Sequence, residues 1–109
     1  MNYKIKYGEE VESDFEEFNK SQKMQILKAI EKAGKNPLPQ NEGGLGKPLG
    51  NKRGRNLTGC CKIVLKQLGI RVVYKLIRID GIMKIIVIAA RADEEVYDIA
   101  EKRIDKYGY

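Results

Sequence analysis

Hydrophobic and cationic residues alternate through the segment from Cys61 to Tyr74. Successive side chains of a β-strand point to opposite faces, so this alternation predicts strands with one apolar and one cationic face. The apolar face would carry Ile63, Leu65, Ile70, Val72 and Tyr74; the other face would carry Lys62, Lys66, Arg71 and Lys75, with Val64 and Val73 among them. Because all the charge on that face is positive, we expect it to meet a polyanion.

Two turns divide this region into three expected strands, at about 56–67, 70–79 and 82–90. The turns are Leu-Gly at 68–69 and Asp-Gly at 80–81, and Asp-Gly between apolar runs is a strong hairpin signal. A two-residue first turn would place Lys66 opposite Arg71. The third strand is nearly all apolar over 85–90, which predicts burial on both of its faces.

Outside that region, apolar residues recur at the three- and four-residue spacing of helices. Val11, Phe15 and Phe18 mark a first short helix, and a second would begin at a Ser21 cap and end at Gly34. The expected elements are a first strand at 3–7, helices at about 11–18, 21–34 and 93–107, and a loop rich in Gly and Pro at 36–55. Their order, β-α-α-β-β-β-α, predicts one α+β domain over residues 1–109, with the helices packed on one face of a mainly antiparallel sheet.

Charge is distributed unevenly along the chain. Twenty-one Lys and Arg against 15 Asp and Glu give a formal net charge of +6, yet no acidic residue occurs between Lys47 and Arg78. This concentration of cations indicates a charged patch rather than a general surplus. We expect Lys66 and the loop cations Lys47, Lys52, Arg53 and Arg55 to contact the phosphates of a nucleic acid.

Histidine is absent, which removes Ser-His and Cys-His nucleophile pairs and the usual zinc sites. Cys60 and Cys61 are adjacent, so on a strand they would point to opposite faces and could not join distant segments. We therefore expect a reduced, cytoplasmic protein without metal or cofactor. The N-terminal residues are polar and no apolar run reaches the length of a membrane-spanning helix, so no membrane association is expected.

Several sequence strings occur together with the predicted order of elements: GG at 43–44 with KPLG at 47–50, KIVL at 62–65, GIRVVY at 69–74, and Arg91 followed by EVY at 95–97. In this combination the chain resembles the RelE/ParE toxin superfamily. The resemblance covers nearly the whole chain. It implies a RelE-like toxin that cleaves messenger RNA in the ribosomal A site and is neutralised by a cognate antitoxin. ParE-like members share the fold but act on DNA gyrase.

The resemblance also implies roles for four residues. The strand lysine of RelE-type active sites falls on Lys62, and the arginine that holds the scissile phosphate falls on Arg71. Arg91 corresponds to the general acid or charge stabiliser, and Tyr97 to the tyrosine that stacks on or orients the nucleotide. A second lysine of the family is replaced here by Val64, so the general base would have to be Lys62 or Lys66.

These residue types suit RNA cleavage without a metal, in which the 2′-OH attacks the adjacent phosphate. That reaction needs a base, cations around the phosphorane and a proton for the leaving oxygen. We expect neighbouring cations to lower the pKa of Lys62 and make it a usable base. Alternatively, Arg71 could form a structural bridge to an acid such as Glu95. Two other functions stay open, namely a ParE-like inhibitor of gyrase and a catalytically impaired relative that binds RNA.

Overall fold

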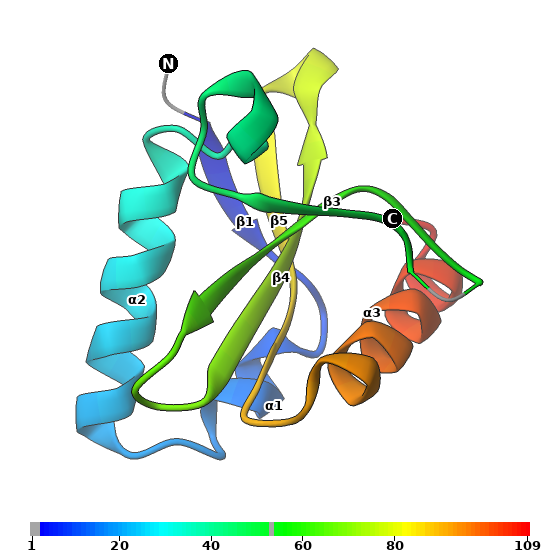
Figure 1. The fold of residues 1–109 in the computed structure, drawn as a ribbon. Coiled ribbons are helices and arrows are strands. Elements are labelled where there is room, and N and C mark those ends of the chain that lie inside the picture. The colour runs from blue at the N-terminus through cyan, green and yellow to red at the C-terminus, as the bar shows by residue number, and fades with distance from the viewer. Residues whose placement is uncertain (1–2, 53) are drawn as a thin grey trace.

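The computed structural model of the chain describes residues 3–52 and 54–109, and its α+β class is the one expected from the sequence (Figure 1). The strands are β1 (Lys4–Tyr7), β2 (Lys47–Lys52), β3 (Arg55–Leu65), β4 (Ile70–Ile77) and β5 (Ile82–Ala89). The helices are α1 (Val11–Phe15), α2 (Lys20–Gly34) and α3 (Asp93–Tyr107), with short 3-10 turns at Gln40–Glu42 and Arg78–Asp80. The strands form one sheet in the order β1-β5-β4-β3-β2. The sheet is mostly antiparallel, as predicted; β1 and β5 run parallel.

The helices cover both faces of the sheet, whereas the sequence led us to expect them on one face. Figure 1 shows α2 and α3 on opposite sides of the strands. Residues of α1 and α2 share one apolar cluster with Ile70, Val72 and Tyr74, and residues of α3 share another with Val73 and Val87. The physical reason is that β4 and β5 are buried on both faces, so each face needs its own helical cover.

Strand β2 lies within the segment that the sequence predicted to be a loop, and it adds a fifth strand to the expected order. The sequence did not predict this strand because it contains Pro48 and Gly50, and proline and glycine are rare inside strands. The ladder between β2 and β3 is irregular between these two residues, and Gly50 has a φ of 57°. Such irregularities are tolerated at a sheet edge, which is where β2 lies.

The β3–β4 hairpin has a longer turn than predicted. Leu65 pairs with Ile70 and Val64 with Arg71, so residues 66–69 form the turn and Lys66 is not in the ladder. The expected pairing of Lys66 with Arg71 is therefore wrong by two positions. A shift of two residues keeps every side chain on its predicted face, so the cationic face of the hairpin is retained.

Helix boundaries follow from local side chains. Asn19, rather than the predicted Ser21, caps α2: its side chain accepts from the backbone N–H of Gln22 at 2.8 Å, and the Gln22 side chain accepts from the Asn19 N–H at 2.9 Å. The last helix spans the predicted range and carries three acids in its first turn, where the helix dipole favours negative charge. None of the helices in the described ranges is long and apolar enough to span a membrane.

A buried contact holds the segment before β2 against the sheet. The hydroxyl of Tyr74 donates to the carbonyl of Pro37 at 2.7 Å, and Tyr74 is fully buried. Gly46 lies directly beside that hydroxyl, because a Cβ built on Gly46 would lie 2.1 Å from the Tyr74 oxygen. The glycine thus allows β2 to start next to β3.

Candidate nucleic-acid site

Three of the four residues implied by the family resemblance meet around a carboxylate that the sequence analysis did not select. Lys62 Nζ donates to Tyr97 Oη at 2.9 Å and to Asp93 Oδ2 at 3.2 Å. Arg71 Nε donates to the other carboxylate oxygen, Asp93 Oδ1, at 2.5 Å. We call Lys62, Arg71, Asp93 and Tyr97 the Asp93 cluster.

The sheet register and the start of α3 bring these residues together. Lys62 pairs with Val73, and Arg71 pairs with Val64, so both cations lie on the face that carries Val73 and packs against α3. Asp93 and Tyr97 are four residues apart on α3, and residues at that spacing share one face of a helix. The first turn of α3 therefore lies over the cationic end of the hairpin.

Hydrogen bonds within the cluster favour the ionised forms of Asp93 and Lys62. Partial burial tends to raise the pKa of Asp93, but hydrogen bonds from Lys62 and Arg71 outweigh it and hold that pKa below its usual range. Burial likewise tends to lower the pKa of Lys62, but its hydrogen bonds to Tyr97 and Asp93 keep the pKa above its usual range. Our expectation that neighbouring cations lower the pKa of Lys62 is thus wrong, because a carboxylate lies between the cations.

Arg71 is fixed by a second contact. Its Nη1 donates to the backbone carbonyl of Arg91 at 2.6 Å, so the guanidinium ties β4 to the loop between β5 and α3. The expected alternative, a bridge from Arg71 to an acid, is realised with Asp93, while Glu95 pairs with Arg91. The side chain of Arg71 is one-quarter exposed, so one side of it remains open to solvent.

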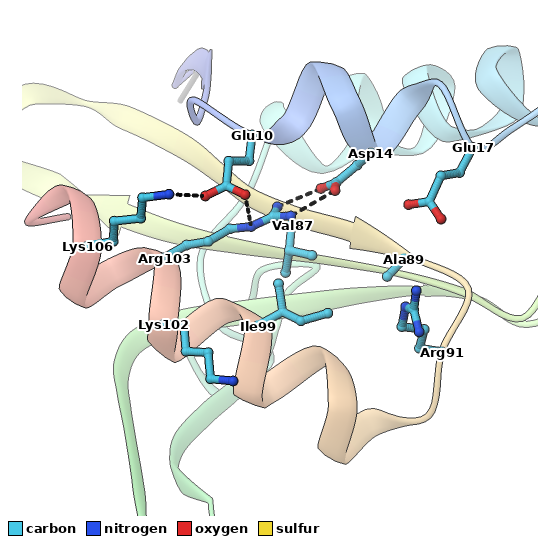
Figure 2. Close-up of a pocket in the computed structure, with 10 residues that line it drawn as sticks. All are labelled: Glu10, Asp14, Glu17, Val87, Ala89, Arg91, Ile99, Lys102, Arg103 and Lys106. Carbon is cyan, nitrogen blue, oxygen red and sulfur yellow. Dashed lines mark hydrogen bonds and ion pairs between the residues drawn. The ribbon is translucent and has the colours of Figure 1, made fainter.

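The side chain of Arg91 pairs with Glu95. Its Nη1 lies 3.4 Å from Glu95 Oε2, and half of the side chain is exposed. Figure 2 shows Arg91 beside Ala89 and Glu17, at one end of a pocket of about 430 Å³. The contact of Arg91 with the Asp93 cluster is made by its backbone carbonyl, which accepts from Arg71.

The expected RNA-contacting cations lie at different distances from the Asp93 cluster. Lys47 is half-buried in β2 and pairs with Lys62 in the β2–β3 ladder, so it extends the cationic face. Arg55, at the far end of β3, contacts Asp98 Oδ1 at 2.5 Å. Lys66 is exposed in the hairpin turn. Lys52 ends β2, with its side chain outside the description, and Arg53 lies outside the described residues.

Asp93 was missed because no motif of the resemblance includes it and because Glu95 was the acid considered for Arg71. One signal was available in the sequence. Asp93 and Tyr97 have the four-residue spacing of a shared helix face, and Tyr97 was already a candidate. A carboxylate at that spacing was the natural partner for cations facing the same helix.

Comparison with known proteins gives a consistent result. A putative RelE-like toxin protein from Escherichia coli is 25% identical over 104 residues, which cover 95% of this chain and 99% of the relative. A double arginine-to-alanine mutant of the E. coli toxin RelE, in the free state, superposes with a TM-score of 0.75 at 25% identity, over 95% of this chain and 99% of the mutant chain. No protein-family model matches the sequence.

Two solved complexes share the fold at lower identity. The same E. coli mutant bound to an antitoxin peptide has a TM-score of 0.68 at 22% identity, over 92% of this chain and 95% of that one. A RelBE-type toxin–antitoxin complex from Mycobacterium tuberculosis has a TM-score of 0.65 at 18% identity, over 85% and 95%. The resemblance to the RelE/ParE superfamily is thereby confirmed: the chain is RelE-like in fold and sequence over nearly its whole length.

Proposed function

We propose that this protein is a RelE-like toxin of the cytoplasm: an endoribonuclease that cleaves messenger RNA on the ribosome and is neutralised by a cognate antitoxin. The observation that carries the proposal is the convergence of Lys62, Arg71 and Tyr97, from three different elements, around one partly exposed carboxylate on a cationic face. The two cations keep part of their surface exposed, whereas Tyr97 is buried. Similarity to RelE structures, one with an antitoxin peptide, supports the same class and the same kind of partner.

The reaction would proceed by attack of a 2′-OH on the adjacent phosphorus. The new bond closes a 2′,3′-cyclic phosphate, and the bond to the 5′ oxygen breaks to leave a 5′-hydroxyl. Protonated Lys62 and the Arg71 guanidinium would stabilise the charge on the phosphorane, and preorganised cations at such a position contribute a few kcal/mol each, as an order of magnitude. Arg91, with an exposed guanidinium, would supply further positive charge from the neighbouring loop.

The raised pKa of Lys62 changes the role proposed for it. At neutral pH its ammonium is protonated, so it suits charge stabilisation or proton donation to the leaving 5′ oxygen better than removal of the 2′ proton. The 2′ proton would then pass to a water molecule as the 2′ oxygen attacks. The ring of Tyr97 is buried in the apolar cluster beneath α3, so it is not free to stack on a base, and Tyr97 would act through its hydroxyl, which accepts from Lys62. The ribosome would complete the geometry by holding the message in place.

The test is expression of the protein in a translating bacterial extract, with 5′ ends mapped on a reporter message. We expect cuts at ribosome-positioned codons and at least a tenfold loss in Arg71→Ala, Arg91→Ala and Tyr97→Phe variants. Arg78→Ala is the matched control, because Arg78 follows the opposite end of β4 and pairs with Glu42. An equal loss of cleavage in Arg78→Ala would contradict the assignment of Arg71, Arg91 and Tyr97 to the site of cleavage.

A second candidate, an RNA-binding relative with little or no cleavage, is favoured by two observations. Val64 is paired with Arg71 at the place where the family has a further lysine, and Lys62 is protonated at neutral pH. Absence of cuts, with RNA still bound, would establish this candidate, and Val64→Lys would then be the first variant to restore cleavage. Absence of cuts with gyrase-dependent plasmid linearisation would identify the ParE-like function instead.

A further inference from the structure

We propose that Asp93 is an internal counter-ion that occupies the position of a substrate phosphate, so that RNA must displace it to bind Lys62 and Arg71. This inference rests on the proposed function, in which the Asp93 cluster binds RNA. It makes Asp93 a residue that sets the affinity of the site, in addition to the residues transferred from the family.

The geometry of the carboxylate supports this assignment. Each oxygen of Asp93 accepts from a different cation, Oδ1 from Arg71 Nε at 2.5 Å and Oδ2 from Lys62 Nζ at 3.2 Å. Two non-bridging oxygens of a phosphate diester make the same demand on a pair of cationic donors. The contacts that a phosphate would need are thus already made by a group of similar shape and the same charge sign.

The charge balance indicates that Asp93 and an RNA phosphate would compete for Lys62 and Arg71 rather than bind them together. Lys62 and Arg71 contribute two positive charges, and Asp93 removes one of them, which leaves a formal charge of +1 at the cluster. Displacement of the carboxylate would return the full +2 to an incoming phosphate. A phosphate bound beside Asp93 would instead meet a like charge at hydrogen-bond distance from its own ligands, which is unfavourable.

Burial indicates which member of the arrangement can move. The side chain of Asp93 is 41% exposed, whereas those of Lys62 and Arg71 are 16% and 25% exposed. Arg71 is additionally held by the carbonyl of Arg91. The cations therefore form the floor of the site, and the carboxylate covers them from the solvent side. After displacement Asp93 would remain at the N-terminal end of α3, where the helix dipole still stabilises its charge.

One consequence is a threshold for binding. A single phosphate would gain two cations but would have to break two ion pairs, so it would bind weakly. A message that also contacts Lys47 and the ribosome would supply the remaining free energy. The counter-ion would thus discriminate against free phosphates and short RNA fragments.

The experiment compares Asp93→Asn with wild type in binding a short single-stranded oligonucleotide whose riboses are 2′-O-methylated, so that cleavage is impossible. Fluorescence anisotropy gives the Kd over a range of salt concentrations. We expect Asp93→Asn to bind about tenfold more tightly, with a salt slope steeper by about 0.7, the value for one additional phosphate neutralised on a single strand. The matched control is Asp105→Asn, which makes the same charge change at an exposed position of the same helix, about 18 Å along its axis.

Unchanged or weaker binding by Asp93→Asn, or an equal gain in Asp105→Asn, would overturn the inference. A readout on wild type guards against a variant that folds poorly. In NMR spectra we expect the Asp93 Cγ and Arg71 Nε resonances to shift on addition of the oligonucleotide, and no shift at saturation would contradict displacement. Binding is measured here without cleavage, so the two proposals can fail separately. If Asp93→Asn gains affinity but the protein cuts no message, the counter-ion role of Asp93 stands and the nuclease function is contradicted.

Discussion

Arg103 on α3 forms a bidentate ion pair with Asp14 on α1, through both terminal nitrogens of its guanidinium. Nη1 lies 2.7 Å from Asp14 Oδ2, and Nη2 lies 2.9 Å from Oδ1 (Figure 2). The Asp14 carboxylate also accepts from the backbone N–H of Ile88 at 3.0 Å, and Arg103 donates to the Ile86 carbonyl at 3.0 Å. This buried pair therefore connects two helices through the backbone of β5.

Removal of either partner should destabilise the fold strongly, because the other loses the two hydrogen bonds that compensate its charge; Arg103 would keep a longer contact with Glu10, at 3.8 Å. The Asp14 side chain is only 7% exposed and that of Arg103 only 13%. We expect Asp14→Ala or Arg103→Ala to lower the free energy of unfolding by about 3–5 kcal/mol, measured by urea denaturation. The double variant Asp14→Leu with Arg103→Met should recover much of this loss, and a double variant as unstable as the sum of the singles would contradict the explanation.

Tyr74 and Gly46 should show coupled effects on stability. Gly46→Ala would place a methyl group in the space held by the Tyr74 hydroxyl and the Cys61 side chain, and we expect a loss of about 1–3 kcal/mol. Tyr74→Phe would leave the Pro37 carbonyl without this donor, at a similar cost of about 1–3 kcal/mol. In the double variant the missing hydroxyl makes room for the methyl group, so the combined loss should be less than additive. Additive losses in the same denaturation assay would show that the two residues do not compete for space.

The two cysteines should be unreactive in the folded protein. Burial raises the pKa of Cys60 to about 12 and also raises that of Cys61, so little thiolate forms at pH 8. They belong to different apolar clusters, on opposite faces of the sheet. We expect a colourimetric thiol reagent to react at the rate of unfolding, with two equivalents released in denaturant. Rapid modification of one thiol in native buffer would show that its face of the sheet is open to solvent.

Stability should fall on the acid side of neutrality. The pKa of Asp93 is lower in the folded protein than its usual value. Hydrogen bonds lower the pKa of three other carboxylates in the same way: Glu10 accepts from Tyr107, Glu42 from Arg78, and Asp98 from Arg55. A carboxylate with a depressed folded pKa stabilises the fold above its unfolded pKa, near 4, and this stability is lost as the pH falls through the folded value.

The pH dependence can be assigned by comparing variants. In urea denaturation between pH 7 and pH 2, the free energy of unfolding should stay the same down to about pH 5 and should decrease at lower pH. Asp93→Asn should lose less stability over the acid range than wild type, because the amide does not titrate. Parallel curves for the two proteins would mean that Asp93 has the same pKa folded and unfolded.

Much of the fold could be predicted from the sequence, because periodicity reports which side chains are buried. The alternation at Ile63, Val72 and Tyr74 gave the correct faces of the hairpin even though the register was wrong by two residues. Which helix covers which face was not predictable in this way, since Val73 and Tyr74 are both apolar and both fully buried.

The candidate site was only partly predictable. Lys62, Arg71 and Tyr97 were selected and do lie together, but their chemical state depends on Asp93, a residue that only tertiary structure brings to them. The error in the pKa of Lys62 has the same origin. The charged residues predicted to lie next to Lys62 on the sheet were cations, whereas in the structure Lys62 forms an ion pair with the Asp93 carboxylate at 3.2 Å.

Strand β2 shows how one set of residues can serve a purpose other than pairing. It is an edge strand, and an exposed edge offers free backbone groups on which strands of other molecules can assemble. Lysine, proline and an irregular ladder are the features by which natural edge strands discourage such assembly, and β2 has Lys47, Pro48 and the irregularity at Gly50. The residues that made this strand hard to recognise are therefore those that protect the sheet from aggregation by strand addition.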